Sequence, residues 1–107
     1  MRSRYCAFSL KIPQYIIKTT HKENQDYKID TKQWENDILE FCNSCIFEKL
    51  ELLEFSTENI SDTTLESFVT FKATLSCDNT DSSFIEKSKF LKVENMWLYH
   101  SGKFLNN

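Results

Sequence analysis

The chain has 107 residues, of which 14% are aromatic, and it holds a single glycine and a single proline. That length suits one domain with one core, and the aromatic content excludes a disordered or low-complexity chain. The formal charge of −3 and the lack of a long apolar run exclude a basic face for duplex nucleic acid and a membrane span. We therefore expect neither a nucleic-acid partner nor a membrane.

The first 44 residues predict three short helices. The first lies within residues 1–11, and Pro13 suits the first turn of a second helix within residues 13–21. Asp30 or Thr31 can cap the N-terminus of the third. Apolar residues recur at helical spacing in the first and third of these segments: Met1, Tyr5 and Phe8, then Trp34, Ile38 and Phe41.

The remainder of the chain predicts antiparallel strands separated by polar turns. Residues 45–56 read as a strand with a bulge near Leu52-Leu53, because the apolar alternation changes phase there. Residues 65–77 form a second strand, and the turn-rich segments 56–64 and 78–83 flank it. Its apolar residues alternate on one face: Val69, Phe71, Ala73 and Leu75.

Residues 84–102 predict a hairpin with a two-residue turn at Glu94-Asn95. On its second strand Trp97 and Tyr99 share a face. On its first strand, alternation separates two faces: Phe84, Glu86, Ser88 and Phe90 on one, and Ile85, Lys87, Lys89 and Leu91 on the other. A carboxylate and a hydroxyl between two phenylalanines are unusual for a plain core face, because an unpaired buried charge is costly. The hairpin therefore predicts a polar site on a sheet.

Helices followed by antiparallel strands indicate an α+β protein with helices on one face of a sheet. The opening MRSRYCAF with Tyr15 and His21, the strand FVTFKATL and the block EKSKFLKVENMWLYHSG resemble the middle domain of the YchJ family. The resemblance implies one domain over residues 1–107 with a nuclear-transport-factor-2-like cone. In such a cone the N-terminal helices pack in a curved four-stranded antiparallel sheet, often around a pocket. Many members add a cysteine-rich zinc motif like that of the SecA translocase, and this chain has no such Cys-x-Cys cluster.

Eight residues at positions of the family pattern are the candidate ligand-binding residues: Arg2, Arg4, Tyr5, His21, Glu86, Ser88, Trp97 and Tyr99. In one interpretation an arginine binds an anion and an aromatic ring stacks on the ligand. In the other, Glu86 pairs with an arginine and closes the wide end of the cone. The first hypothesis is a non-enzymatic module for a small polar or anionic ligand or a protein partner. The alternative is an isomerase- or hydrolase-like enzyme with Glu86 as general base.

Histidines and cysteines offer further candidates. His21 is placed at the end of the second helix, where a cation can cap the last carbonyls, and His100 at an exposed strand end. Cys42 and Cys45 have the spacing of half a zinc site or of a redox pair, but a second close pair is missing and the pair follows a helix. We expect no metal and no cofactor, and thiols instead of disulfides in a cytoplasmic protein.

The outward face of the hairpin mixes apolar and basic side chains. Sheets of cone folds often pair across such a surface, which predicts a homodimer, whereas interspersed lysines also keep a sheet solvated and unpaired. The sequence leaves both alternatives open. If the ring of Trp97 belongs to the core, its replacement by alanine should cost about 3–5 kcal/mol.

Overall fold

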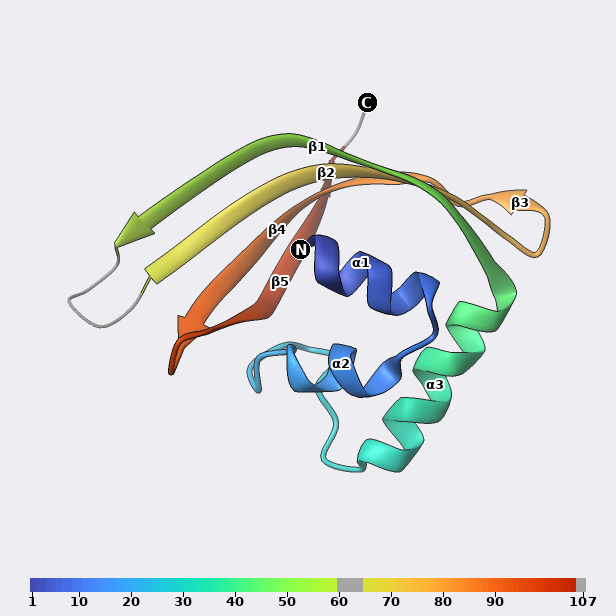
Figure 1. Ribbon diagram of the computed structural model, residues 1–107, viewed down its shortest axis with the longest axis horizontal. Coiled ribbons are helices and arrows are strands. Elements are labelled where there is room, and N and C mark those ends of the chain that lie inside the picture. The colour runs from blue at the N-terminus through green and yellow to red at the C-terminus, as the bar shows by residue number, and fades with distance from the viewer. Residues whose placement is uncertain (60–64, 106–107) are drawn as a thin grey trace.

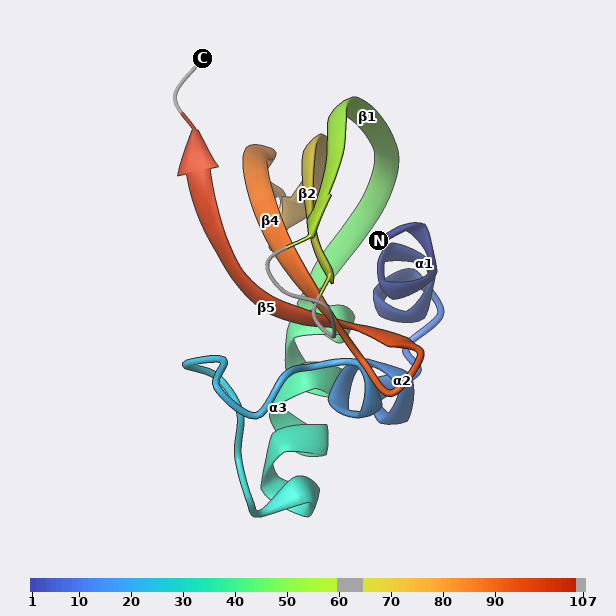
Figure 2. The same ribbon diagram turned by 90° about the vertical axis from the view of Figure 1, so that its left-hand side faces the viewer.

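The computed structural model describes residues 1–59 and 65–105, in which three helices precede a curved antiparallel sheet (Figure 1). The helices are α1 (Arg2–Ser9), α2 (Pro13–Lys18) and α3 (Thr31–Ser44). The strands are β1 (Cys45–Asn59), β2 (Leu65–Cys77), β3 (Thr80–Asp81), β4 (Phe84–Val93) and β5 (Met96–Leu105). The long strands follow the order β1-β2-β4-β5, and the sheet bends over the helices (Figures 1 and 2). The expected α+β cone is confirmed.

The helices begin and end where local sequence signals place them. Pro13 occupies the first turn of α2, where its missing N–H is not needed. Asp30 caps α3, because its side chain accepts a hydrogen bond from the backbone N–H of Gln33 at 3.1 Å. Trp34 and Ile38 are buried in the helical core as predicted, whereas Phe41, the third residue of the predicted apolar stripe, is 42% exposed.

The β1–β2 hairpin is longer than predicted. Its pairing shifts register between Phe47 and Lys49 and again between Leu52 and Glu54, so the bulge expected near Leu52-Leu53 is confirmed. The strand does not end at residue 56, because cross-strand pairing continues to Asn59. The rest of the turn predicted over residues 56–64 lies outside the described residues.

Both predicted turns of the C-terminal half contain residues with positive φ. Glu94 and Asn95 have φ values of 50° and 67°, which confirms the two-residue turn between β4 and β5. Asp78 and Asn79 have φ values of 52° and 63° and turn the chain back, so that β3 pairs with the end of β2. The sequence predicted a turn over residues 78–83 but not this short strand.

One cysteine prediction is wrong. Cys45 and Cys77 stand opposite each other on β1 and β2, with their Cα atoms 4.0 Å apart, and they form a disulfide. Cys42 is a buried free thiol in the helical core, so the Cys42 and Cys45 pair is divided between two environments. Free thiols were predicted from the expected cellular compartment alone. That reasoning does not consider the register of β1 and β2, which brings these two distant cysteines together.

Across the described part of the chain, none of the helices has both the length and the apolar character needed to cross a bilayer.

Candidate functional site

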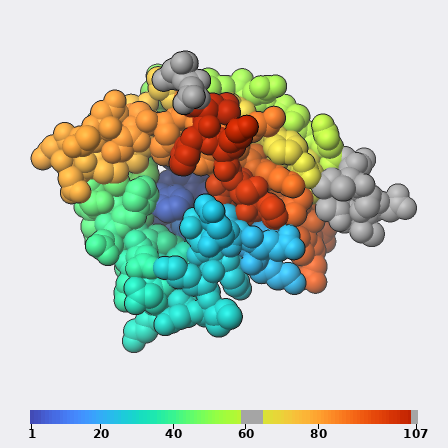
Figure 3. Space-filling model, turned by 180° about the vertical axis from the view of Figure 1, so that it is seen from behind, coloured from blue at the N-terminus to red at the C-terminus, as the bar shows by residue number. Residues whose placement is uncertain are grey.

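A cavity of about 450 Å³ lies between the helices and the concave face of the sheet. Figure 3 shows α1 at the bottom of a hollow bordered by α3, the segment before it and the C-terminal strands. Aromatic side chains form much of the wall, with Phe47, Phe71, Phe84 and Phe90 from the sheet and Phe8 and Trp34 from the helices. Three charged residues also line it, Asp26, Lys28 and Asp37, and Lys28 pairs with Asp37. Its volume falls within the range of about 300–1,000 Å³ that small-molecule sites occupy.

A polar cluster interrupts the aromatic wall on β4 and β5. Glu86 and Ser88 are two residues apart on one strand, so both point toward the cavity. The Oε2 atom of Glu86 accepts hydrogen bonds from the hydroxyl of Ser88 and, at 3.0 Å, from that of Tyr99. Gly102 faces this cluster, and a Cβ there would collide with Glu86 Oε2 and the Tyr99 hydroxyl. The single glycine of the chain therefore makes room for the carboxylate.

Arg4 brings a positive charge from α1 to the same end of the cavity. Its Nη1 donates to the carbonyl of Ile16 at 3.2 Å and to the hydroxyls of Thr19 and Thr20 at 2.7 and 3.2 Å. Its Cζ lies 4.7 Å from the centroid of the Tyr99 ring, a cation–π arrangement. Burial lowers the pKa of Arg4 to about 10, although Tyr99 and Glu86 oppose the shift, so the side chain stays charged at neutral pH.

The expected ion pair between Glu86 and an arginine does not form among the described residues. Arg4 is held by α2 and the threonines that follow it, and Glu86 is held by two hydroxyls. The negative charge of Glu86 therefore stays on the cavity wall without a direct cationic partner in the part of the chain that the structure describes.

The pKa of the Tyr99 hydroxyl depends on its surroundings in this cluster, and it makes the stability of the fold depend on pH. Burial, and next the Glu86 carboxylate, raise the pKa of Tyr99 above its ordinary value. The stability that this shift contributes is complete below about pH 10, the usual tyrosine pKa, and is lost as the pH rises above it. Tyr99→Phe should therefore flatten the alkaline fall in the free energy of unfolding, measured by urea denaturation. Tyr15→Phe, which removes a surface hydroxyl, is the control; an equal flattening there would contradict the prediction.

The structure brings five of the eight sequence-predicted residues to the cavity wall: Arg4, Tyr5, Glu86, Ser88 and Tyr99. Arg2 is exposed on α1. Trp97 lies near the tip of the β4–β5 hairpin, two residues after the Glu94-Asn95 turn, and is 36% exposed. The sequence could not separate Trp97 from Tyr99, because alternation puts both on one face and does not say how far the helices reach along it.

His21 does not cap the second helix, and His100 is not simply exposed. The helix ends at Lys18, and the backbone N–H of His21 donates to the carbonyl of Tyr99 on β5 at 2.8 Å. The side chain of His21 is buried, and its ring centroid lies 5.2 Å from that of His100. The predicted roles were wrong because the segment after α2 runs along β5 instead of into solvent.

Sequence reasoning missed the part of the wall that this segment supplies. Thr20 and Asn24 line the cavity, and both are buried. The side chain of Asn24 accepts from the N–H of Asp26 at 2.8 Å, an Asx turn, and donates to the carbonyl of His100 at 2.8 Å. An asparagine in a polar connection is the only local signal of such a turn.

Comparisons with known proteins agree with this geometry at the level of fold. Residues 1–102 match the family model for the middle NTF2-like domain of YchJ. A UPF0225 protein of Enterobacter sp. (strain 638) is 31% identical over 102 residues, which cover 95% of this chain and 62% of that protein. The chain thus spans less than two thirds of the length of the curated relatives that it matches.

Solved structures are similar to the protein over almost the whole chain. A SEC-C motif containing protein from Rhodopseudomonas palustris superposes with a TM-score of 0.77 at 28% identity, covering 99% of this chain and 76% of that one. Another, from Psychrobacter arcticus, gives a TM-score of 0.67 at 29% identity, covering 100% and 59%. A protein with a cystatin-like fold from Caulobacter vibrioides, at 13% identity and a TM-score of 0.60 over 98% of this chain and 84% of that one, shows the fold alone.

Proposed function

The chain belongs to the family of YchJ middle NTF2-like domains, and from that premise we propose that it is a non-enzymatic module that binds a small ligand in its cavity. The observation that supports this proposal is the open cavity of about 450 Å³ beside Glu86 and Ser88. Had phenylalanine side chains filled that space, a small ligand would have no room. A wall with a large aromatic share and polar groups gathered on part of it is typical of sites that bind a largely apolar ligand and orient it by one end.

The charges around the cavity favour a ligand that donates hydrogen bonds over an anion. The Nη1 atom of Arg4 donates to three protein acceptors, and Lys28 on the cavity wall is paired with Asp37. The carboxylates of Glu86 and Asp26 also line the cavity. A carboxylate has about four lone-pair sites, so Glu86 can accept more bonds than the two from Ser88 and Tyr99. An anionic group in this position would lie close to a negative charge. We therefore expect an aromatic or aliphatic ligand with an amine or hydroxyl at one end.

Three fragments with the same phenyl body test this proposal: phenethylamine, phenethyl alcohol and hydrocinnamate, which carry an ammonium, a hydroxyl and a carboxylate. Each is titrated into the ¹³C,¹⁵N-labelled protein and followed by amide and side-chain NMR shifts. The amine and the alcohol should shift resonances of Phe71, Ser88 and Tyr99, and the carboxylate should shift them much less. Glu86→Gln should weaken the amine most, because the ammonium loses a charged partner. Glu94→Gln, in the exposed turn, is the matched control.

Two outcomes would contradict the proposal. If none of the three fragments shifts a cavity resonance, the cavity does not bind small ligands of this kind. If hydrocinnamate binds more tightly than phenethylamine, Arg4 and not Glu86 sets the ligand chemistry, and an anionic ligand, one of the classes expected from the sequence, replaces the one proposed.

An isomerase- or hydrolase-like enzyme with Glu86 as general base is the second candidate. The observation that favours it is a carboxylate on the wall of an otherwise largely aromatic cavity, next to the hydroxyl of Tyr99. Such a base should exchange the α-protons of a small ketone such as cyclohexanone with solvent deuterium, and Glu86→Gln should abolish the exchange. Exchange at the rate of buffer alone would exclude this activity for the ketone.

A further inference from the structure

The segment that follows α2 is fixed against β5 over several residues. The N–H of Tyr99 donates to the carbonyl of Thr19 at 2.7 Å, and the N–H of His21 donates back to the carbonyl of Tyr99 at 2.8 Å. The side chain of Asn24 donates to the carbonyl of His100 at 2.8 Å. These bonds hold the two histidines side by side although 78 residues separate them in the sequence.

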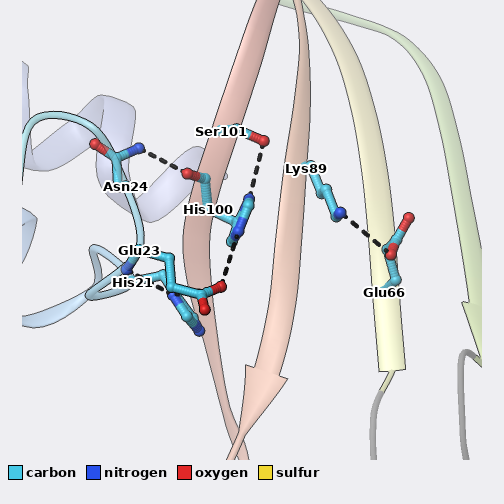
Figure 4. Close-up of polar contacts among 7 residues, drawn as sticks. All are labelled: His21, Glu23, Asn24, Glu66, Lys89, His100 and Ser101. Carbon is cyan, nitrogen blue, oxygen red and sulfur yellow. Dashed lines mark hydrogen bonds and ion pairs between the residues drawn. The ribbon is translucent and has the colours of Figure 1, made fainter.

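His21, Glu23 and His100 converge at this contact (Figure 4). One ligand atom from each residue lies within 4.8 Å of the others. The Nε2 atom of His100 is 3.3 Å from Glu23 Oε1, and the Nδ1 atom of His21 is 3.9 Å from the same oxygen. Two atoms bound to one zinc ion at about 2.0–2.1 Å are about 3.3–3.4 Å apart in a tetrahedral site. The His100–Glu23 pair already has this separation, and the His21–Glu23 pair needs a movement of about half an ångström. The two histidine nitrogens, which lie within 4.8 Å of each other, need to approach by up to about 1.5 Å.

We propose that His21, Glu23 and His100 form a site for a divalent transition-metal ion of the zinc type. Imidazole nitrogens suit zinc, copper, nickel and iron, and a carboxylate completes a set of three ligands that leaves a position for water. The side chain of Glu23 is 65% exposed, so the site opens to solvent and the carboxylate can rotate. The histidine side chains are 11% and 23% exposed, which holds their rings in place.

Neighbouring hydrogen bonds prepare one ligand and compete for the other. The Oγ atom of Ser101 lies 3.0 Å from His100 Nδ1, so it can accept a hydrogen bond from the Nδ1–H group and leave the lone pair of Nε2 free for the metal. The Nδ1 atom of His21 accepts from the backbone N–H of Glu23 at 3.0 Å. The metal takes the place of that N–H, so the amide of Glu23 reports directly on binding.

The site would connect metal binding to the cavity. Thr20 and Asn24, on the same segment as His21 and Glu23, line the cavity wall. Backbone and side-chain hydrogen bonds already join the segment after α2 to β5. A metal ion bound to His21, Glu23 and His100 would add a further connection between them. It acts as a positioning element for the wall and touches no ligand in the cavity.

The test is a titration of the full chain with zinc chloride, followed by isothermal calorimetry and by ¹H–¹⁵N NMR. We expect one ion per chain, shifts of both imidazoles, and a large shift of the Glu23 amide. Loss of a residue that hydrogen-bonds to a metal ligand typically weakens binding by about 10–100-fold. Ser101→Ala should therefore weaken zinc binding by about 10-fold or more, and His100→Ala, which removes a ligand itself, by at least as much as 10–100-fold. Glu23→Gln removes the carboxylate ligand, so it should weaken zinc binding. Because the side chain is 65% exposed, the domain should stay folded.

Two controls separate this site from other zinc ligands. Cys6 is an exposed free thiol, so all measurements are repeated in a Cys6→Ser background, where binding should persist. Glu94→Gln removes an exposed carboxylate elsewhere and should leave binding unchanged. Zinc binding that disappears with Cys6→Ser, that survives both His100→Ala and Glu23→Gln, or that is not detected at all would overturn the proposal.

Discussion

Replacing Trp34 by alanine is expected to lower the free energy of unfolding by about 3–5 kcal/mol. The ring of Trp34 is 5% exposed and belongs to the helical core with Ile16 and Ile38. It also meets Tyr27 edge-on, with ring centroids 5.3 Å apart. Truncation removes the contacts of a large ring and leaves a space that the short helices cannot fill, and both effects destabilise the fold. Chemical denaturation followed by circular dichroism measures the loss.

Trp97→Ala is the matched control, because the chain has two tryptophans and the second is 36% exposed. Its replacement should cost no more than about 1–2 kcal/mol, since much of the ring stays in water in the folded state. Each variant also leaves one tryptophan as a fluorescent probe of the other region. Equal losses for the two variants would show that the hairpin end is packed as tightly as the helical core.

Replacing Arg4 by alanine is expected to cost about 2–4 kcal/mol, because a charged donor with three acceptors is lost from a partly buried site. The hydroxyls of Thr19 and Thr20 lose a hydrogen bond, and the ring of Tyr99 loses its cation–π contact. The guanidinium joins α1 to the end of α2 and to β5, so its loss affects three elements at once. Urea denaturation at neutral pH provides the measurement.

Arg2→Ala is the control for Arg4→Ala, since Arg2 lies on the same helix and is exposed. It should change the free energy of unfolding by no more than about 0.5 kcal/mol. Arg4→Lys keeps the charge but not the planar group of donors, and should fall between the two. A loss below about 1 kcal/mol for Arg4→Ala would mean that water replaces the guanidinium without penalty.

The sheet and its turns were predictable because their signals are local. Alternation of two residues assigns Glu86 and Ser88 to one face of β4, and Asn95 marks a turn that needs positive φ. The change of phase at Leu52-Leu53 likewise indicates a bulge, which the register of β1 and β2 contains. In each case the information lies within a few neighbouring residues.

The roles of the histidines and cysteines were not predictable from the same kind of evidence. His21 was placed at a helix end and Cys45 beside Cys42, because each was interpreted with its neighbours in sequence. Their actual contacts are His100 and Cys77, which lie far along the chain. No spacing rule relates such residues before the register of the strands is known.

For this protein the sequence by itself determined the order of the three helices and the four long strands, the turn at Glu94-Asn95 and the inward face of β4, since these follow from backbone preferences and from the period of apolar residues. Only the tertiary structure decided which inward residues surround open space, which tryptophan is buried, and which distant side chains meet. Those properties depend on how far short helices extend beneath a curved sheet and on the strand register. Both arise from packing between segments that do not influence one another locally.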